Sequence, residues 1–155
     1  MSKFDVKMVE IRTASENDIP IILGMLYELG RPKPEIDSDV DMFRKLVKKY
    51  ITSSDKQILL AVSNETKIIG MISIVFLPRL NHDTLEMYIP ELIVLEKYQR
   101  QGIGKKLIHA CILLAQEKKC HRIRLESGNQ RKESHQFYTN LGFEQPSLSF
   151  TLNLN

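Results

Sequence analysis

The first third of the chain changes from a strand-like to a helix-like spacing of apolar residues. Residues 6–14 alternate between apolar and polar side chains, which predicts a first strand. Ser15 then offers a helix N-cap, and the apolar residues of 19–29 recur at helical spacing until Gly30. A second helix is predicted over 39–51. Its inward face is predicted to hold Val40, Phe43, Leu46 and Val47.

The middle of the chain has the β-rich pattern of a sheet. Residues 57–63 and 67–76 read as two strands joined by a tight hairpin at 64–66. A longer strand is predicted over 84–95, but Pro90 lacks the N–H that a central strand needs. Either the strand is bulged or splayed around Pro90, or it only begins there.

The last third alternates helices and strands. An amphipathic helix is predicted over 105–119, followed by a strand that includes Ile123 and Leu125. A short helix over 132–141 ends at Gly142, and the alternating residues 147–154 predict a final strand. The order is strand, helix, helix, three strands, helix, strand, helix, strand. It predicts one α/β domain over residues 1–155 with a mixed sheet.

Composition narrows the class of protein only modestly. The 155 residues are 43% hydrophobic and 26% charged, and the net charge of +3 is too small to indicate nucleic-acid binding. The charged N-terminus and the interrupted apolar run 68–77 predict neither a signal peptide nor a membrane span. Cys111 and Cys120 lie nine residues apart, on and at the end of one predicted helix, beyond disulfide reach. Reduced thiols favour a cytoplasmic location.

The segment 99–104, Gln-Arg-Gln-Gly-Ile-Gly, lies between a buried strand and an amphipathic helix. A glycine-rich turn that opens a helix presents backbone N–H groups and the positive end of the helix dipole to an anion. A P-loop would need glycine in place of Gln99 and a hydroxyl residue in place of Lys106. A dinucleotide fingerprint would need a small residue in place of Leu107. Both nucleotide motifs are therefore rejected.

The turn instead matches the Gln/Arg-x-x-Gly-x-Gly/Ala turn of the GNAT acetyltransferases. A second segment, 135–144, resembles the closing helix of that family, with a tyrosine followed by Leu-Gly-Phe. Within the superfamily the nearest likeness is to small bacterial aminoalkylphosphonate N-acetyltransferases. The shared residues are Glu91-Leu92-Ile93-Val94, Arg131, His135, Phe137-Tyr138 and Glu144-Gln145.

The resemblance implies a GNAT-like fold, mostly antiparallel, with two splayed central parallel strands and about four helices. Acetyl-CoA would lie between the splayed strands, and its pantetheine arm would pair with the backbone of 92–94 as an added strand. The residues assigned to acetyl-CoA are Leu92, Ile93, Val94, Gln99, Arg100, Gln101, Gly102, Ile103, Gly104, Lys105, Lys106, Asn129, His135 and Tyr138. Lys97, Arg100 and Lys105 are the candidates for its 3′-phosphate.

Acetyl transfer to a primary amine needs a base and an acid. A protonated amine has no lone pair, so a group must accept its proton, directly or through water. Glu91, just before the strand end that binds acetyl-CoA, is the leading candidate, with Glu126 and then Tyr88 as alternatives. Tyr138 occupies the position from which the family protonates the leaving thiolate. The scattered histidines predict no metal site.

Three questions stay open at this level: the acceptor, the acyl-chain length and the base. The acceptor, a small molecule or a peptide, would bind the segment 26–49 and the turn 79–83, where acids outnumber bases and favour a cationic amine. A catalytically idle acyl-CoA-binding regulator is the alternative function, but it would need neither Glu91 nor Tyr138. The last strand offers a pairing edge for a homodimer.

Overall fold

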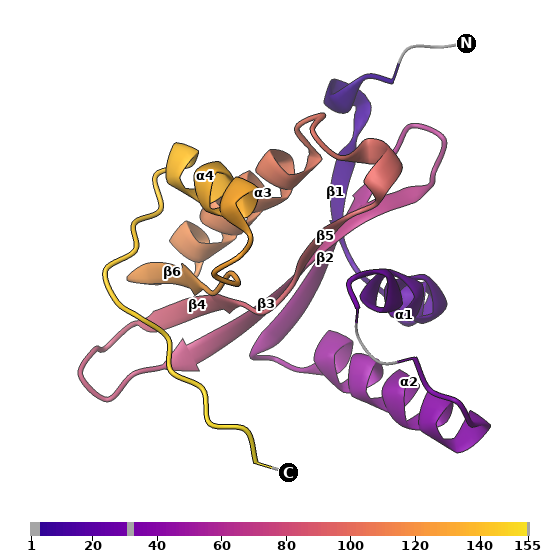
Figure 1. Ribbon diagram of the computed structural model, residues 1–155, viewed down its shortest axis with the longest axis horizontal. Coiled ribbons are helices and arrows are strands. Elements are labelled where there is room, and N and C mark those ends of the chain that lie inside the picture. The colour runs from indigo at the N-terminus through magenta and orange to yellow at the C-terminus, as the bar shows by residue number, and fades with distance from the viewer. Residues whose placement is uncertain (1–3, 31–32, 155) are drawn as a thin grey trace. The chain divides into compact units, whose positions relative to one another are not determined.

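The computed structural model describes residues 4–30 and 33–154. By its internal contacts the chain divides into two compact units, Met1–Arg124 and Leu125–Asn155, and each is described by itself. The helices and strands are β1 (Glu10–Thr13), α1 (Ile19–Glu28), α2 (Asp37–Thr52), β2 (Lys56–Val62), β3 (Ile68–Pro78), β4 (Leu85–Ile89), β5 (Leu92–Val94), α3 (Ile103–Glu117), β6 (Arg122–Leu125) and α4 (Lys132–Asn140) (Figure 1). Single 3₁₀ turns occupy Val6–Met8 (η1), Glu16–Asp18 (η2) and Glu96–Tyr98 (η3).

The sheet has the order β1-β2-β3-β4-β6, and β5 pairs with β3 beyond the end of β4. The pairs β1–β2, β2–β3, β3–β4 and β3–β5 are antiparallel. The crossover through α3 brings β6 back beside β4 as its parallel neighbour. β4 therefore has a strand on each side, whereas β5 pairs with β3 alone. The predicted α/β fold, with a mixed sheet whose central strands diverge, is confirmed.

The interruption at Pro90 is a β-bulge. Ile72 pairs with Leu92 and Val75 pairs with Tyr88, so three residues on the β4–β5 side face two residues on β3. The extra residue bends the strand and separates β4 from β5. Of the two interpretations of Pro90, the structure supports the bulge.

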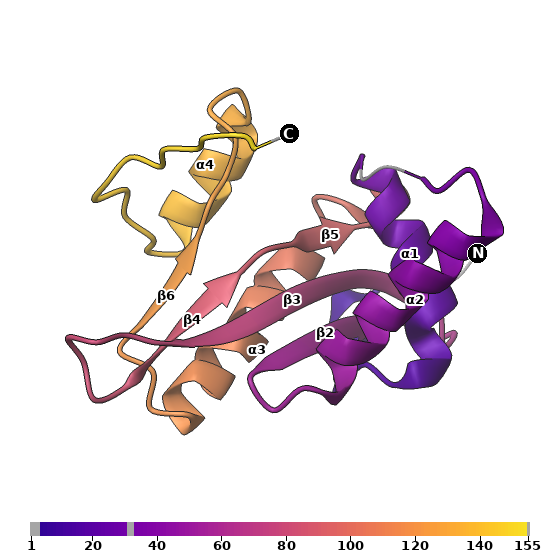
Figure 2. The same cartoon turned by 90° about the horizontal axis from the view of Figure 1, so that it is seen from below.

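Helices cover both faces of the sheet in the first unit. α1 and α2 lie together against β2 and β3, and α3 lies on the other face (Figure 2). The core under α1 and α2 includes Ile22, Leu23, Val47, Leu60, Met71 and Ile93. On the α3 face β3 passes so close to its neighbours that a Cβ on Gly70 would lie 3.1 Å from the carbonyl oxygen of Ile93 and 3.3 Å from Ile103 and Leu107. This contact fixes β5 and the start of α3 against the centre of the sheet.

Two predicted segments at the start of the chain are wrong in detail. The predicted strand 6–14 begins as the 3₁₀ turn η1, because the side chain of Asp5 accepts a hydrogen bond from the Lys7 N–H at 2.9 Å. Only Glu10–Thr13 pairs with β2. Leu46, predicted to face the core, is 52% exposed, whereas Val47 is buried.

The second unit holds the end of β6, α4 and an extended tail. α4 ends where predicted, since Gly142 adopts φ 93°, which favours glycine. The predicted final strand 147–154 is wrong, because no strand pairing includes the described residues after Leu125. Leu148, Phe150, Leu152 and Leu154 are 74–91% exposed. Among the described residues, no helix has the length and apolar character needed to cross a membrane.

Candidate active site

β5 presents one open edge. Gly70, Met71 and Ile72 of β3 occupy its other edge, in register with Val94, Ile93 and Leu92. Within the described part of the chain no strand pairs with the open side of β5. The side chain of Gln99 donates to the carbonyl oxygen of Val94 at 3.0 Å and ties the following turn to the end of β5. An extended ligand can therefore add to this edge as a further strand.

The turn after β5 has the geometry of an anion site. Gly102, the N-cap of α3, adopts φ 88°, and Arg100 also has a positive φ, of 60°. A left-handed N-cap glycine turns the chain so that the first N–H groups of α3 point out of the helix end. The Gln101 side chain donates to the carbonyl oxygen of Lys97 at 3.1 Å and fastens the turn to η3.

Lys106 contributes to the fold instead of the turn. Its backbone N–H donates to the carbonyl oxygen of Gly102 at 3.0 Å, as the first hydrogen bond of α3. Its ammonium donates to the carbonyl oxygens of Val6, at 3.2 Å, and Val9. The backbone N–H groups that are available to an anion at the start of α3 are therefore those from Gly102 to Lys105.

Glu91 lies at the bulge, and Ser73 holds it there. The Glu91 N–H donates to the Ser73 hydroxyl oxygen at 2.9 Å, and the Ser73 N–H donates to the Glu91 carbonyl oxygen at 3.0 Å. The same hydroxyl donates to the Glu91 carboxylate. One serine thus fixes both the backbone and the side chain of Glu91 beside the first residue of β5. The sequence pattern alone did not single out Ser73.

Tyr50 of α2 brings a second hydroxyl to the same place. Burial raises the pKa of Tyr50 to about 12, and the negative charge of Glu91 adds to the shift. Its hydroxyl is buried and makes no hydrogen bond of normal geometry within the described residues, although the neighbouring Ser73 hydroxyl partly offsets the rise in its pKa. Nothing in the sequence singled out Tyr50, because a tyrosine near the end of an amphipathic helix is usually a packing residue.

The far end of β4 carries a buried carboxylate among arginines. Glu86 is fully buried, and its two carboxylate oxygens accept from the Nε atoms of Arg124 and Arg122, each at 2.7 Å. Arg79 Nε lies 3.9 Å from the same carboxylate. Burial alone would raise the pKa of Glu86, but the hydrogen bonds from Arg124 and Arg122 outweigh it and lower the pKa. The spacing of these residues along the sequence did not reveal this group.

In the second unit Tyr138 lies on α4 between two aromatic rings. Its ring meets Phe137 at 5.1 Å and Phe143 at 5.7 Å between centroids, both edge-on. Burial raises the pKa of Tyr138, while Arg131 acts in the opposite direction. The hydroxyl therefore stays protonated at neutral pH and can donate a proton.

His135 and Asn129 have separate surroundings within that unit. His135 Nε2 lies 2.8 Å from the carbonyl oxygen of Gly128 and fixes the loop before α4. Asn129 is exposed at the tip of that loop. The geometry gives His135 a structural role and leaves the side chain of Asn129 accessible to a ligand.

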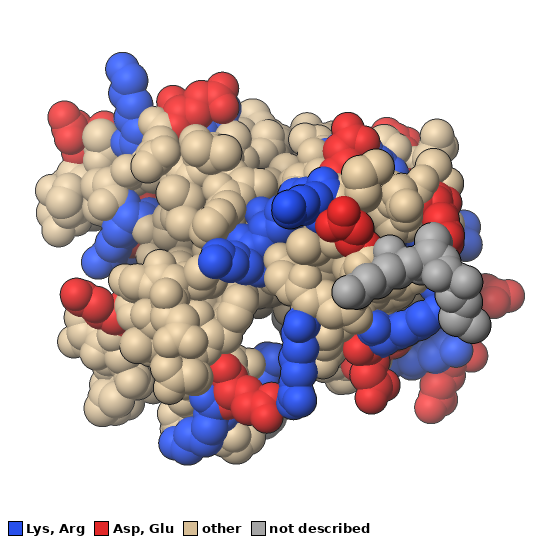
Figure 3. Space-filling model, turned by 90° about the horizontal axis from the view of Figure 1, so that it is seen from above, with Lys and Arg blue, Asp and Glu red and all other residues tan. Residues whose placement is uncertain are grey.

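The described surface also carries a shallow hollow. The hollow, of about 450 Å³, lies between Lys33–Ile36 and the first turns of α2, within the segment predicted to bind the acceptor. The described residues contain no group of three or more histidine, cysteine or acidic side chains that could hold a metal. On the face in Figure 3, lysines and arginines are interspersed with acidic side chains.

Comparison with known proteins agrees with this geometry. A family model described as Acetyltransferase (GNAT) family matches residues 23–143. A transcriptional regulator from Bacillus halodurans is 25% identical, with a TM-score of 0.82 over 94% of this chain and 99% of that one. An aminoglycoside acetyltransferase from an uncultured soil metagenomic sample is 22% identical, with a TM-score of 0.78 over 96% and 98%. A ribosomal-protein-alanine N-acetyltransferase from Brucella melitensis is 14% identical, with a TM-score of 0.78 over 94% and 99%. The last two likenesses show the fold alone.

Proposed function

Since the chain belongs to the acetyltransferase (GNAT) family, we propose that it moves the acetyl group of acetyl-CoA to a primary amine by direct attack in a ternary complex. Membership of this family identifies the protein as an N-acetyltransferase. The observation that carries the mechanism is the bulge, which holds the Glu91 carboxylate on Ser73 directly before the open edge of β5.

The residues present fit acetyl-CoA. The open edge of β5, Leu92–Val94, supplies backbone groups for the pantetheine amides. The N–H groups from Gly102 to Lys105, together with the α3 dipole, would hold the pyrophosphate. Lys97, Arg100 and Lys105 are exposed near this turn and are proposed for the 3′-phosphate. Acetyl-CoA supplies the activated thioester.

Glu91 is the proposed general base. A primary amine is mostly protonated at neutral pH, and Glu91 accepts its proton directly or through one water so that the nitrogen lone pair can attack. The Ser73 hydroxyl keeps the carboxylate oriented, and Tyr50 places an unpaired donor beside it. Glu126 remains the alternative base.

Tyr138 is the proposed general acid. Its raised pKa keeps the proton on the hydroxyl until the thiolate leaves, and Tyr138 then donates that proton to sulfur. His135 holds the loop that precedes the Tyr138 helix and thereby positions it. Asn129 is proposed to contact acetyl-CoA.

The acceptor is proposed to be a small molecule or a peptide with a primary amine. Structures with this fold include an aminoglycoside acetyltransferase and a ribosomal-protein-alanine N-acetyltransferase, so the fold itself does not choose between these classes. The likeness to aminoalkylphosphonate N-acetyltransferases adds a third class to test.

The test is thiol release from acetyl-CoA with a panel of aminoglycosides, amino acids, aminoalkylphosphonates and peptides. We expect turnover with at least one acceptor and a loss of about 100-fold in kcat for Tyr138→Phe. Tyr98→Phe is the matched control, because Tyr98 packs on Phe4 and is given no role in transfer.

The alternative function is a regulatory module that binds acyl-CoA without turnover, which the likeness to a transcriptional regulator keeps in view. Tight binding of acetyl-CoA without amine-dependent thiol release would support that module and contradict the transferase.

A further inference from the structure

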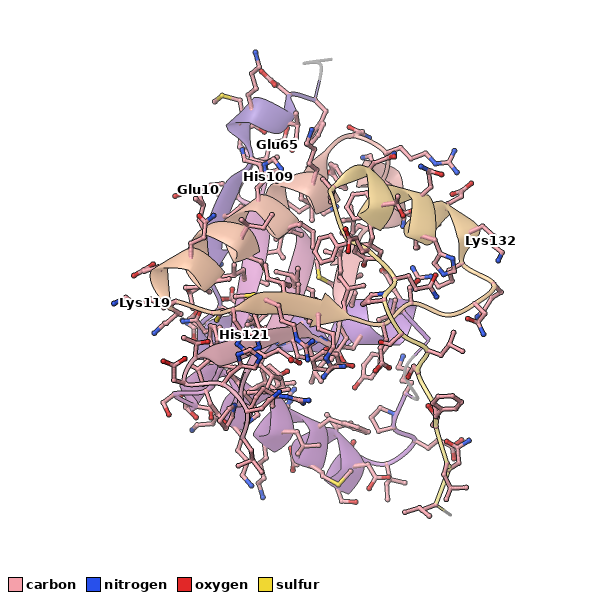
Figure 4. The ribbon with its side chains drawn as sticks, turned by 90° about the vertical axis from the view of Figure 1, so that its left-hand side faces the viewer. Glu10, Glu65, His109, Lys119, His121 and Lys132 are labelled. Atoms are coloured by element: carbon pink, nitrogen blue, oxygen red, sulfur yellow. The ribbon has the colours of Figure 1, made fainter. Side chains whose placement is uncertain are left out.

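Three guanidinium groups surround one carboxylate at the edge of the sheet, and we call Arg79, Arg122, Arg124 and Glu86 the arginine cluster. Glu86 is fully buried, whereas the arginine side chains are 44%, 50% and 38% exposed. The guanidinium groups therefore stand between the buried charge and the solvent. In Figure 4 side-chain nitrogen atoms gather beside the labelled His121, the residue before Arg122.

The cluster holds more positive charge than the buried carboxylate needs. A buried carboxylate is compensated by one well-placed guanidinium, and here two of them already bind both oxygens. Arg122 directs its Nε and Nη2 to Glu86, and its remaining donors make no hydrogen bond within the described residues. Arg79 lies beyond hydrogen-bond distance at 3.9 Å. Guanidinium donors match a carboxylate or phosphonate in pairs.

The cluster and the proposed base lie on the same face of the sheet. Alternate residues of β3 share a face, so Ser73, Val75 and Leu77 point the same way. Ser73 holds Glu91, Val75 pairs with Tyr88, and Leu77 pairs with Glu86. The three positions form one row on the α2 side, where Met71 of the same strand packs.

The spacing along this row of strand residues sets the length of an acceptor that would reach from Glu91 to the arginine cluster. Two residues of strand advance about 7 Å, so the Tyr88 position lies about 7 Å from Glu91 and the Glu86 position about 14 Å. The guanidinium of Arg124 lies 4.6 Å from the centre of the Tyr88 ring and reaches back toward Glu91. An extended amino acid with four methylenes separates its amine from its carboxylate by about 6 Å, which fits the nearer position. The guanidinium groups of Arg122 and Arg79 lie close to that of Arg124, because all three meet at the one Glu86 carboxylate.

We propose that the arginine cluster binds an anionic group of the acceptor, so that this protein acetylates amines that also carry a carboxylate, phosphonate or phosphate. The proposal rests on the proposed acetyl transfer. It reverses the expectation of a cationic acceptor, which came from counting acidic residues along 26–49 without knowing which of them face the sheet.

The test compares acceptors that differ only in charge. Thiol release is measured with 5-aminopentanoate, its uncharged amide and 1,5-diaminopentane. We expect kcat/KM to be at least tenfold higher for the acid than for the amide, and lowest for the diamine. Arg122→Gln should remove most of this preference by raising KM for the acid, while the amide changes less than twofold.

Lys7→Gln is the charge-matched control. Lys7 is exposed in η1, which leads into β1 at the opposite edge of the sheet, so its loss should leave the preference for the acid unchanged. Arg79→Gln leaves both close contacts of Glu86 intact and repeats the test without risk to the buried ion pair.

Equal kcat/KM for acid and amide, or a preference for the diamine, would overturn the proposal. So would a loss in Arg122→Gln and Arg79→Gln that is the same for both acceptors, since that marks a purely structural cluster. If no amine supports turnover, the proposed function fails, and binding of 5-aminopentanoate to the CoA-bound protein is followed by ligand-observed NMR. Binding that Arg79→Gln abolishes supports the anion site, and no binding overturns it.

Discussion

Ser73 holds the backbone and the side chain of Glu91, the proposed base, at once. In a regular strand residue 91 would pair backbone to backbone and its side chain would be free. The bulge keeps one backbone bond, from the Ser73 N–H to the Glu91 carbonyl oxygen. It replaces the other with the Ser73 hydroxyl, which accepts from the Glu91 N–H and donates to its carboxylate. Tyr50, Ser73 and Glu91 therefore form a small polar site on an apolar face.

The proposed role of Glu91 as the base predicts how the rate depends on pH. Glu91→Gln removes the proton acceptor, so kcat/KM at pH 7 should fall about 100-fold. The rate of the variant should then rise nearly tenfold per pH unit up to pH 9, because only the amine that is already neutral can react. Glu65→Gln in the exposed β2–β3 turn is the control. An unchanged rate for Glu91→Gln would transfer the role to Glu126.

The buried hydroxyl of Tyr50 predicts a change in the free energy of unfolding. Its buried hydroxyl makes no hydrogen bond within the described residues, and such a group costs about 1–3 kcal/mol. Tyr50→Phe should therefore raise the free energy of unfolding in urea by about 1 kcal/mol while it lowers kcat/KM for the acceptor. A less stable variant would show that the hydroxyl is satisfied by the protein.

At the scale of elements, the close packing of β3 against β5 and α3 brings the open edge of β5 and the turn at the start of α3 together. Gly70 is the point of contact, with the Ile93 carbonyl oxygen 3.1 Å from the position of an added Cβ. Because that neighbour is backbone, it cannot rotate away as a side chain would. The turn at Gly102 is therefore held by packing as well as by hydrogen bonds from Gln99 and Gln101.

Gly70→Ala should lower the free energy of unfolding by about 1–3 kcal/mol and weaken acetyl-CoA binding, because β5 or α3 must shift. Gly24→Ala is the matched control. It lies inside α1 with nothing within 4 Å of its added Cβ, and it should stabilise the protein by about 0.5–1 kcal/mol. Equal effects of the two substitutions in urea unfolding would contradict the close contact.

An ion pair between Arg12 and Asp18 stabilises the start of α1, and its contribution is lost over a defined range of pH. Arg12 donates to both oxygens of Asp18 at 2.8 and 2.9 Å, and the Ser15 N–H donates to the same carboxylate at 2.7 Å. The hydrogen bonds from Arg12 outweigh burial and lower the pKa of Asp18 from 3.8 to about 2. The unfolded chain therefore takes up this proton first as the pH falls, and the stabilisation is lost between about pH 4 and pH 2.

Asp18→Asn should cost about 1–2 kcal/mol at pH 7, a value reduced for screening because the Arg12 side chain is 41% exposed. The difference from the parent protein should shrink as the pH falls from 4 to 2. Asp41→Asn on the exposed face of α2 is the control. A difference in unfolding free energy that does not depend on pH would contradict the lowered pKa of Asp18.

At the scale of the whole molecule, the sequence predicted the order of elements well because local signals mark each boundary. Gly30, Gly142 and the 64–66 turn end elements where predicted, and Pro90 marks the bulge. It also predicted Glu91 and the turn 99–104, whose roles stay proposals. It could not predict Tyr50, which the packing of α2 on the sheet puts in place. Nor could it predict the arginine cluster, because register across β3, β4 and β6 brings those residues together. Alternation in 147–154 suggested a strand, yet alternation alone provides no partner strand.

The extended tail, residues 147–154, is expected to exchange its amide hydrogens rapidly. Its N–H groups over 147–154 donate no hydrogen bond within the described residues, so they should exchange at nearly intrinsic rates while β3 amides exchange slowly. Mass-spectrometric exchange at two protein concentrations checks this. Protection of 147–154 that grows with concentration would show that a second copy pairs with the tail, as a homodimer would require.

The central claim is direct transfer of acetyl from acetyl-CoA to an amine, and two-substrate initial-rate kinetics test it most directly. Thiol release is measured with acetyl-CoA and 5-aminopentanoate varied against each other. Direct attack in a ternary complex predicts double-reciprocal lines that intersect, with no acetylated protein in the intact mass after acetyl-CoA alone. Parallel lines with an acetylated protein, or thiol release that does not depend on the amine, would contradict the account.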